Sequence, residues 1–530
     1  MPRFLRFPAL LLALLPTLLF VGAFYPGLFV GFTLVDDSTL NRVVIRWFVS
    51  NGAWSELLYN TSVQGGARYT PVFWMVKALI LGAFGYNAVV YHAIHLFFCW
   101  VPLCGVPLYF AYRHKKWSLA FLPFLFFLIF SGTGWGSQLW NLYDVSTYDP
   151  LAVFFLSLTL VLLDRVTLEN EPTRKYGLFL LIFLCMVGSA HSKEAYGLAL
   201  LAFAVCFFLF WAFFRNRIYG LISIIAALSS LLFFWGYWYS GAMGMRSAND
   251  YTATYSLQPT LIISNSWFVI KSYLIHGTYL LPVVLTLTCL RFLSKPMREK
   301  FFVSDSLGSP MIILPLLAIV LILHGIQLPV EFLPDQPRLY YAGVIFLSYF
   351  STLILLPVLT SEHQGLPKWL NPNVIFLFLL LPGVFVPFRV MTFNSIYTYS
   401  IGMDWNAVLQ ARNILKKHPD TVVSVYSPDS KSFYWGMFIH LENMNITPGI
   451  ERYSAENNTI LLTKNSILLT RDEQLYSRYT VVDEMMNILT PQPTGSYLWA
   501  CTDYRYILSL IRGREVAPFR LEVYSTVTWR

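Results

Sequence analysis

AYGLALLAFAVCFFLFWAFF, residues 195–214, runs for 20 positions without a charged side chain. A helix needs about 20 apolar residues to cross the hydrocarbon core of a bilayer, so this stretch predicts a membrane-spanning helix. The basic residues Arg215 and Arg217 follow at once, and a second apolar stretch, residues 218–239, comes next. Apolar runs joined by short basic connections predict a polytopic α-helical membrane protein.

The composition of the whole chain supports this class. Of its 530 residues, 56% are hydrophobic and only 12% are charged, whereas soluble proteins carry roughly 25% charged residues. The net charge of +9 does not indicate nucleic acid, because basic cytoplasmic loops give the same sum. The six cysteines show no spacing typical of a zinc site or of a disulfide framework.

The same length rule predicts about eleven spans. They are residues 8–28, 86–112, 117–131, 150–163, 176–189, 195–214, 218–239, 270–290, 311–326, 340–359 and 374–390. Basic residues cluster in alternate connections, which predicts a cytoplasmic N-terminus and an outside location for everything after about Arg389. Residues 70–85 contain Lys77 and would spoil this alternation as a span, so we expect an amphipathic helix in the outer interface.

These predictions divide the chain into two parts. Residues 1–392 form a transmembrane domain, with a first outer loop at about residues 29–85 that carries amphipathic helices. Residues 393–530 are more polar and are expected to form a small mixed α/β domain outside the membrane. An amphipathic helix is predicted from Asp404 to Lys417 and a strand over residues 421–426. The predicted location is the inner membrane, with the second domain periplasmic or extracellular.

Ionisable and aromatic residues gather in four loops on the predicted outer side. Such residues at the end of a span are candidates for a functional site. The first loop holds Asp36, Asp37 and Arg68; the second Trp140, Asp144, Tyr148 and Asp149; the third Lys193 and Glu194; and a later one Arg338.

These residue types together indicate a reaction. Carboxylates can act as a general base toward a hydroxyl, and cations at the interface can hold a phosphate leaving group. Aromatic and amide side chains can hold a sugar ring. A sugar on a polyprenyl phosphate fits all three features, because its tail lies in lipid, its phosphate at the interface and its sugar outside.

Five motifs in order resemble the GT-C superfamily of lipid-linked glycosyltransferases, and most closely its protein O-mannosyltransferase and TMTC-like branches. They are Asp36-Asp37, Arg68-Tyr69-Thr70-Pro71, the run from Gly85 to His92, Ser192-Lys193-Glu194, and Arg338-Leu339-Tyr340-Tyr341. The resemblance covers roughly residues 1–360. It departs from these branches in an Asp-Asp pair instead of Asp-Glu, in the lack of tetratricopeptide repeats and in the C-terminal domain, so it suggests a bacterial envelope enzyme using undecaprenyl phosphate.

The resemblance implies residue roles. One of Asp36 and Asp37 is the catalytic base or orients the acceptor, with Asp37 slightly favoured, and Lys193 and Arg338 bind the donor phosphate, with Arg68 as a third cation. Contacts to sugar or acceptor are expected from Asp149, Tyr148, Asp144, Glu194, His92, Trp140 and Tyr341. The acceptor is a hydroxyl of an envelope glycan, a lipid or a protein, and the displacement inverts the anomeric carbon.

Other interpretations stay open at this stage. The Asp pair could cap a helix, Lys193 could pair with Glu194, and His92 could be a buried hydrogen-bonded histidine. A divalent cation could bind through Asp36, Asp37 and Asp149, although no oxygen-ligand loop signature is present. The same cations could serve a lipid-sugar flippase, whose ionisable residues usually lie near the midplane, or a ligase or polymerase that uses a polyprenyl diphosphate donor.

Overall fold

The computed structural model describes most of the transmembrane part and short stretches of the C-terminal part. The described residues are 3–29, 31–33, 36–59, 68–131, 138–242, 256–276, 284, 310–330, 337–359, 405, 408–409, 412–413, 415–416, 422–426, 439–446, 466–470, 481–483 and 525–528. The predicted span at residues 374–390 and the domain boundary at residue 392 lie outside them.

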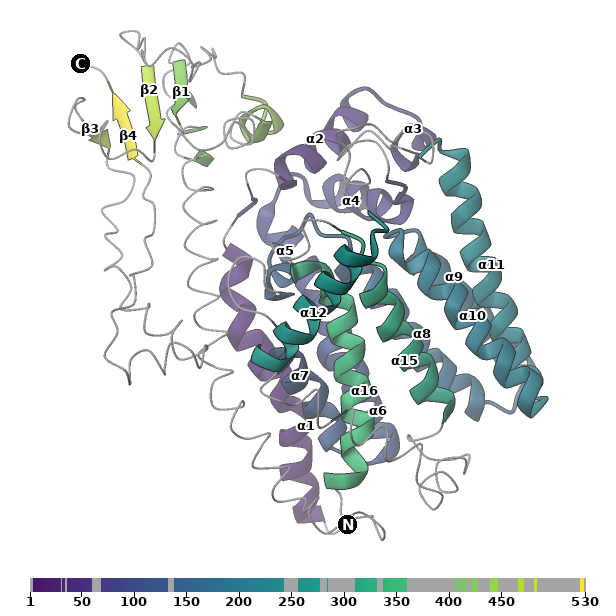
Figure 1. Cartoon of the computed structure of the whole chain (residues 1–530). Coiled ribbons are helices and arrows are strands. Elements are labelled where there is room, and N and C mark those ends of the chain that lie inside the picture. The colour runs from purple at the N-terminus through teal and green to yellow at the C-terminus, as the bar shows by residue number, and fades with distance from the viewer. Residues whose placement is uncertain are drawn as a thin grey trace.

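The first half of the chain forms a helical bundle with three shorter helices at one end (Figure 1). Its elements are α1 (Arg3–Phe24), η1 (Tyr25–Phe29), α2 (Asp36–Val49), α3 (Trp54–Leu58), α4 (Pro71–Phe84), α5 (Ala88–Trp100), η2 (Val101–Gly105), α6 (Val106–His114), α7 (Ser118–Phe130), η3 (Gln138–Leu142) and α8 (Asp149–Leu168). Helices α2, α3 and α4 lie at the end of the bundle opposite the N-terminus. We call this the α2–α4 end. The opposite end, which holds the N-terminus and the basic residues 113–116 at the end of α6, is the basic end.

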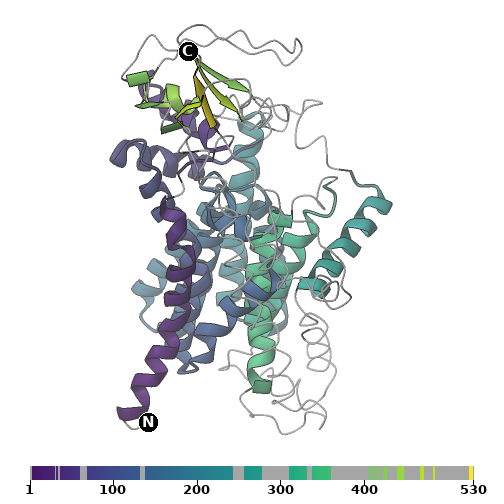
Figure 2. The same cartoon turned by 90° about the vertical axis from the view of Figure 1, so that its left-hand side faces the viewer.

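The second half adds further helices and a small sheet. Its elements are α9 (Pro172–Ala190), α10 (Ala195–Phe214), α11 (Arg217–Tyr239), α12 (Pro259–His276), α15 (Pro310–Gly325), η6 (Pro337–Tyr340), α16 (Tyr341–Leu359), β1 (Val422–Tyr426), β2 (Ser466–Thr470), β3 (Val481–Asp483) and β4 (Ser525–Thr528). The strands lie beyond the α2–α4 end, far from the N-terminus (Figure 2).

The chain is a polytopic α-helical membrane protein, as the sequence predicts. In the described part, five helices are long and apolar enough to cross a membrane: residues 88–114, 149–168, 172–190, 195–214 and 217–239. The first of them joins α5, η2 and α6 into one rod with a π-helical turn, which the sequence analysis did not predict. The prediction for residues 270–290 was wrong at its start, because α12 already begins at Pro259.

The C-terminal strands form one mixed sheet in the order β1-β2-β4-β3. Strands β1 and β2 are parallel, with Val422 opposite Ser466, and β4 runs antiparallel to both β2 and β3. The expected strand at residues 421–426 is thus β1. The α/β domain expected over residues 393–530 otherwise stays a prediction.

Helices α10 and α11 pack closely because small and hydroxyl residues line their contact. The Ser230 hydroxyl donates to the Gly197 carbonyl at 2.8 Å, and the Ser223 hydroxyl donates to the Ala204 carbonyl at 2.8 Å. Without a hydrophobic driving force in lipid, helices associate through such close contacts and hydrogen bonds. Between the helices, the Asn216 side chain caps α11 by accepting from the Ile218 N–H at 2.9 Å.

Gly197 therefore cannot carry a side chain without moving its neighbour. A Cβ atom there would lie 2.3 Å from the Phe233 ring. We expect Gly197→Ala to lower the free energy of unfolding by about 1–3 kcal/mol, the usual cost of overpacking. The control is Gly177→Ala on α9, where nothing lies within 4 Å and alanine should help the helix slightly. Equal thermal unfolding midpoints in detergent for the two variants would contradict this close packing.

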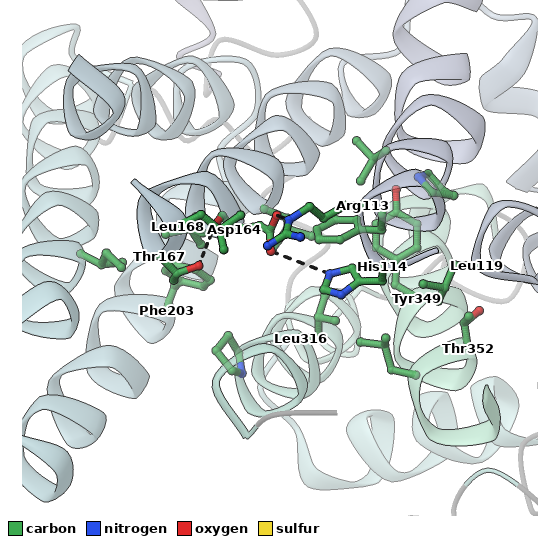
Figure 3. A pocket seen from close by; sticks show the side chains of 18 of the residues that line it. Arg113, His114, Leu119, Asp164, Thr167, Leu168, Phe203, Leu316, Tyr349 and Thr352 are labelled. Carbon is green, nitrogen blue, oxygen red and sulfur yellow. Dashed lines mark hydrogen bonds and ion pairs between the residues drawn. The ribbon is translucent and has the colours of Figure 1, made fainter. Parts of the chain in front are cut away.

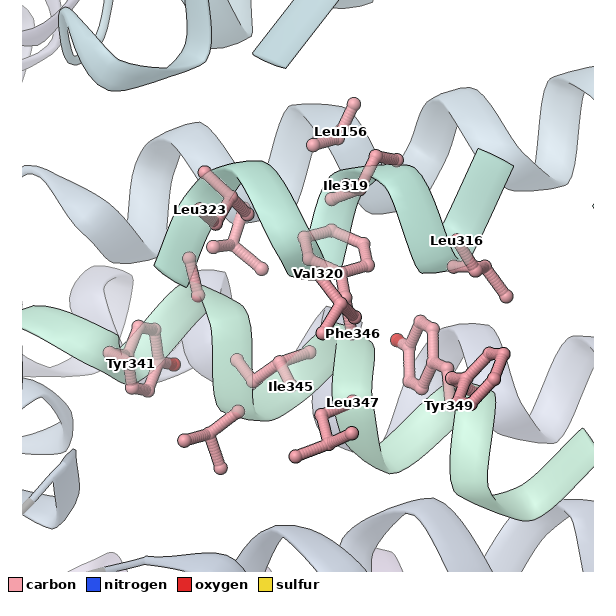
Figure 4. Packing of buried hydrophobic residues seen from close by; sticks show 14 of the residues in the cluster. Leu156, Leu316, Ile319, Val320, Leu323, Tyr341, Ile345, Phe346, Leu347 and Tyr349 are labelled. Carbon is pink, nitrogen blue, oxygen red and sulfur yellow. The ribbon is translucent and has the colours of Figure 1, made fainter. Parts of the chain in front are cut away.

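The bundle core continues through α8, α15 and α16. Leu156 of α8, Ile319 and Val320 of α15, and Ile345 and Phe346 of α16 fill the space between the three helices (Figure 4). All five side chains are buried. This packing holds the start of α16 against α8, whose first residue belongs to the candidate site.

Candidate functional site

Loops that are far apart in sequence meet at the α2–α4 end. The Val72 N–H, at the start of α4, donates to the His191 carbonyl in the turn after α9 at 3.1 Å. The Lys193 side chain from the same turn reaches Asp149 at the start of α8. Three of the four predicted outer loops are thereby joined around the first turn of α8.

Asp149 and Lys193 form a buried ion pair. The Lys193 Nζ contacts Asp149 Oδ2, and the Tyr196 hydroxyl donates to Asp149 Oδ1 at 3.2 Å. The two charged side chains are only 9% and 11% exposed. Asp149 is the first residue of α8, where a negative charge is favoured by the helix dipole. The pair of Lys193 with Glu194 considered above is replaced by a pair with Asp149.

Two cations and two aromatic rings form a row near this pair, with the two rings in the middle. The guanidinium of Arg68 lies over the Tyr148 ring, 5.3 Å from its centroid. The Tyr148 ring contacts the Phe73 ring at 4.1 Å between centroids, and Lys77 Nζ lies 5.4 Å from the Phe73 ring. Such cation–π contacts stabilise most when desolvated. Tyr148 precedes Asp149 in the chain, so Arg68 and Tyr148, both predicted site residues, lie near the buried pair.

Lys77 marks a second charged centre. Its side chain is 5% exposed, its Nζ donates to the Val145 carbonyl at 2.7 Å, and it lies 4.9 Å from the Tyr91 ring. Burial lowers the pKa of Lys77, and the negative charges of Asp37 and Asp144 act in the opposite direction. Helix α4 is too short to span a membrane, as expected. The prediction that it is amphipathic was wrong, because Lys77 points inward while Leu79 and Phe84 are exposed. Lys77 was not among the predicted site residues.

Asp37 is fully buried and helps to fix the first loop. Its Oδ2 accepts the Thr33 N–H at 2.8 Å, and its own N–H donates to the Thr33 hydroxyl at 3.2 Å. This reciprocal pair starts α2 in the manner of a capping box. For Asp36 and Arg338, the structure describes only the backbone, in the first turn of α2 and in η6.

Asp144 and Trp140 are tied to each other. The Trp140 indole N–H donates to Asp144 Oδ2 at 2.8 Å, and the Ser146 N–H donates to Asp144 Oδ1 at 3.0 Å. Asp144 is 1% exposed. These bonds shape the loop before α8, so the predicted contact of Asp144 and Trp140 with a sugar would require this loop to open.

Histidines from two parts of the chain hold residues 31–33. The His92 Nε2 lies 2.6 Å from the Gly31 carbonyl, and His92 has no exposed surface. The His440 Nε2 lies 2.9 Å from the Thr33 carbonyl. A carbonyl can only accept, so each Nε2 carries a proton and donates. His92 matches the buried, hydrogen-bonded alternative considered in the sequence analysis.

The C-terminal part of the chain contacts residues 31–33 and the elements beside them. The Tyr86 hydroxyl lies 2.5 Å from His440 Nδ1, and Arg42 of α2 forms an ion pair with Glu442 at 2.9 Å. Trp405 packs so closely on Gly31 that a Cβ there would lie 2.0 Å from its indole, and Gly31 has a φ of +80°. Burial lowers the pKa of His440 to about 4. The C-terminal part therefore holds the loop that carries the acidic pair.

Two further predicted residues, Glu194 and Tyr341, lie at the starts of α10 and α16. Glu194 precedes α10 and is half-buried, and Tyr341 begins α16, is fully buried and interacts electrostatically with Asp149 and Tyr196. Among the described side chains, no group of three histidine, cysteine or acidic residues could hold a metal ion. Asp149 is instead neutralised by Lys193.

Comparisons with known proteins give structural likeness only. No protein-family model matches the sequence, and no curated protein sequence matches it significantly. The crystal structure of ArnT from Cupriavidus metallidurans in the apo state is similar at 12% identity, over 88% of this chain and 96% of that one, with a TM-score of 0.43. ArnT from the same organism bound to undecaprenyl phosphate is similar at 12% identity, over 96% and 97%, with a TM-score of 0.44.

Proposed function

We propose that the chain is a GT-C-type membrane glycosyltransferase, which moves a sugar from a polyprenyl-phosphate donor to a hydroxyl acceptor at the α2–α4 end. The observation that carries the proposal is the buried pair of Lys193 and Asp149 beside Arg68. Burying an ion pair costs several kcal/mol of desolvation, so a contribution to stability does not explain why this pair is buried. At the end of a membrane span, such a pair is better explained by a function.

The donor phosphate would lie between Arg68 and Lys193. Arg68 is half-buried, and its planar guanidinium suits two phosphate oxygens at once. Asp149 orients the Lys193 ammonium, whose remaining protons can donate to the phosphate. Arg338 would supply a third cation. The polyprenyl tail would stay in lipid beside the bundle, and the sugar would point to the loops at the α2–α4 end.

The transfer would be a single displacement. A carboxylate takes the proton of the acceptor hydroxyl, and the hydroxyl oxygen attacks the anomeric carbon of the sugar. The bond from this carbon to the phosphate oxygen breaks, and polyprenyl phosphate leaves with the electron pair, stabilised by Arg68 and Lys193. The anomeric centre is inverted.

Of the two acidic residues, we assign the proton transfer to Asp36. Asp37 has no exposed surface, and one of its oxygens is already engaged by the Thr33 N–H. A general base must come within hydrogen-bond reach of the hydroxyl proton. Asp37 instead holds the loop and balances the charge of Lys77. This reverses the slight preference for Asp37 given by the sequence.

The test is transfer of a radiolabelled hexose from polyprenyl phosphate to an envelope extract by purified protein in liposomes. Asp36→Asn should lower the rate by about 10²- to 10⁴-fold, the usual contribution of a general base, with donor binding and thermal stability kept. Asp37→Asn should lower thermal stability, because Lys77 loses a compensating charge. Glu56→Gln, an exposed carboxylate on α3, is the matched control.

The two arms of this experiment separate the candidate functions. Normal transfer by a variant that carries both Asp36→Asn and Asp37→Asn would overturn the proposed catalytic role of the pair. Donor binding or translocation without any transfer by the unaltered protein would favour the flippase instead.

A further inference from the structure

A large cavity lies at the basic end, away from the proposed catalytic site. Its volume is about 580 Å³, within the range typical of ligand pockets. Helices α6, α7, α8, α10, α11, α15 and α16 all contribute to its walls (Figure 3). The walls are mainly leucine, phenylalanine, isoleucine and proline side chains, such as Phe110, Leu160, Phe207 and Leu316.

A small polar cluster lies at one place in this apolar wall. Asp164 of α8 accepts the Tyr109 hydroxyl at 2.7 Å, and Arg113 Nε and His114 Nε2 each lie 3.9 Å from its carboxylate. Arg113 is 38% exposed, whereas Asp164 is 10% exposed. The carboxylate is therefore largely buried, while the guanidinium is partly exposed. Figure 3 shows Arg113 and His114 beside Asp164.

We propose that this cavity binds one acyl chain of an anionic glycerophospholipid, with the lipid phosphate against Arg113. The mainly apolar walls suit a hydrocarbon chain, because such a chain has no polar group that would lose its hydrogen bonds inside the cavity. Arg113 opens the basic run of residues 113–116, and basic residues next to a span attract anionic lipid head groups. The acyl chain enters between the helices, while the head group stays at the basic end of the bundle.

Location favours a phospholipid over two other occupants. A soluble polar ligand would leave its hydrogen bonds unmet against these walls. The polyprenyl-phosphate donor is assigned above to the opposite end of the bundle, where Lys193 and Arg68 lie. Arg113 lies at the end of the membrane-spanning segment of residues 88–114, so the phosphate of a phospholipid in the leaflet at the basic end would be within its reach. The exclusion of polyprenyl phosphate rests on the function proposed above, whereas the apolar walls and the position of Arg113 do not depend on it.

The test is native mass spectrometry of the protein released from nanodiscs that contain equal amounts of phosphatidylglycerol and phosphatidylethanolamine. One phosphatidylglycerol should stay bound. Leu316→Trp, which places an indole in the cavity, should lower its retention at least tenfold. Leu228→Trp is the control, because Leu228 faces outward from α11 with 48% exposure.

Arg113→Ala tests the head group without filling the cavity. This variant should keep a bound lipid but lose the preference for phosphatidylglycerol over phosphatidylethanolamine. Its partly exposed position makes folding a lesser concern than for Leu316→Trp. Equal retention by all variants, or retention of polyprenyl phosphate in place of phospholipid from a mixed membrane, would overturn the proposal.

Discussion

Replacing Lys193 by methionine is expected to lower the free energy of unfolding by about 3–5 kcal/mol, because it leaves the Asp149 carboxylate buried without its partner. The side chains are about a tenth exposed, so water can replace little of the lost interaction. Tyr196 would still donate to Asp149 Oδ1 but supplies no full charge. Equilibrium unfolding in detergent, followed by tryptophan fluorescence, measures this loss.

The double variant Lys193→Met, Asp149→Asn separates structure from function. With both charges removed, most of the stability should return, because a neutral pair has no large desolvation cost. Glycosyl transfer should not return, since the donor phosphate has lost one of its cations. Lys271→Gln on α12, an exposed lysine, is the control for loss of a positive charge. Full transfer by the double variant would mean that the pair is structural only.

The sequence predicts well the five helices that are long and apolar enough to cross a membrane, because their physics is local. A run such as residues 195–214 is apolar throughout, and its length alone decides that it can cross a bilayer. The π-helical turn at Val101–Gly105 and the early start of α12 at Pro259 depend on tertiary packing. Asn265 of α12, for example, donates to the carbonyls of Leu328 and Val330.

The candidate site is predictable only in part, for a related reason. The sequence predicts a site made of ionisable or aromatic residues at span ends. Four of these residues lie together: Asp149, Lys193, Arg68 and Tyr148. Their pairing could not be predicted, because spacing along the chain does not decide which cation a carboxylate meets.

Two further residues were missed. Lys77 could have been found, since a lysine inside an apolar helix is costly unless it has partners. His440 carried no such signal, because it lies 407 residues from Thr33, the residue to which it donates.

Replacing His440 by alanine is expected to lower the transfer rate by about a hundredfold, although His440 is not proposed to touch either substrate. The histidine bridges the Thr33 carbonyl and the Tyr86 hydroxyl. The Thr33 N–H in turn donates a hydrogen bond to the Asp37 carboxylate. Losing the bridge would let the loop of the acidic pair shift, and a displacement of about 1 Å can cost 10²-fold in rate. Donor binding at Arg68 and Lys193 should stay the same, which distinguishes this effect from general unfolding.

The matched control lies in the same segment. Asn445 is exposed and has a φ of 58°, so Asn445→Gly removes a side chain without straining the backbone. This variant should transfer sugar at the normal rate. An equal loss of transfer rate in His440→Ala and Asn445→Gly would show that the segment tolerates no substitution. The loss in His440→Ala could then not be attributed to its bridge.

The same bridge should make stability depend on pH. Because burial lowers the pKa of His440 to about 4, the unfolded chain binds a proton near pH 6.5 that the folded chain does not. Stability should therefore fall as pH drops from about 6.5 toward 4, by about 3 kcal/mol at most. His440→Gln, which cannot be protonated there, should lack this part of the pH dependence. The free energies of unfolding of the unaltered protein and of His440→Gln should therefore converge as the pH falls. A constant difference between these two free energies from pH 7 to pH 4 would exclude a neutral buried histidine at this contact.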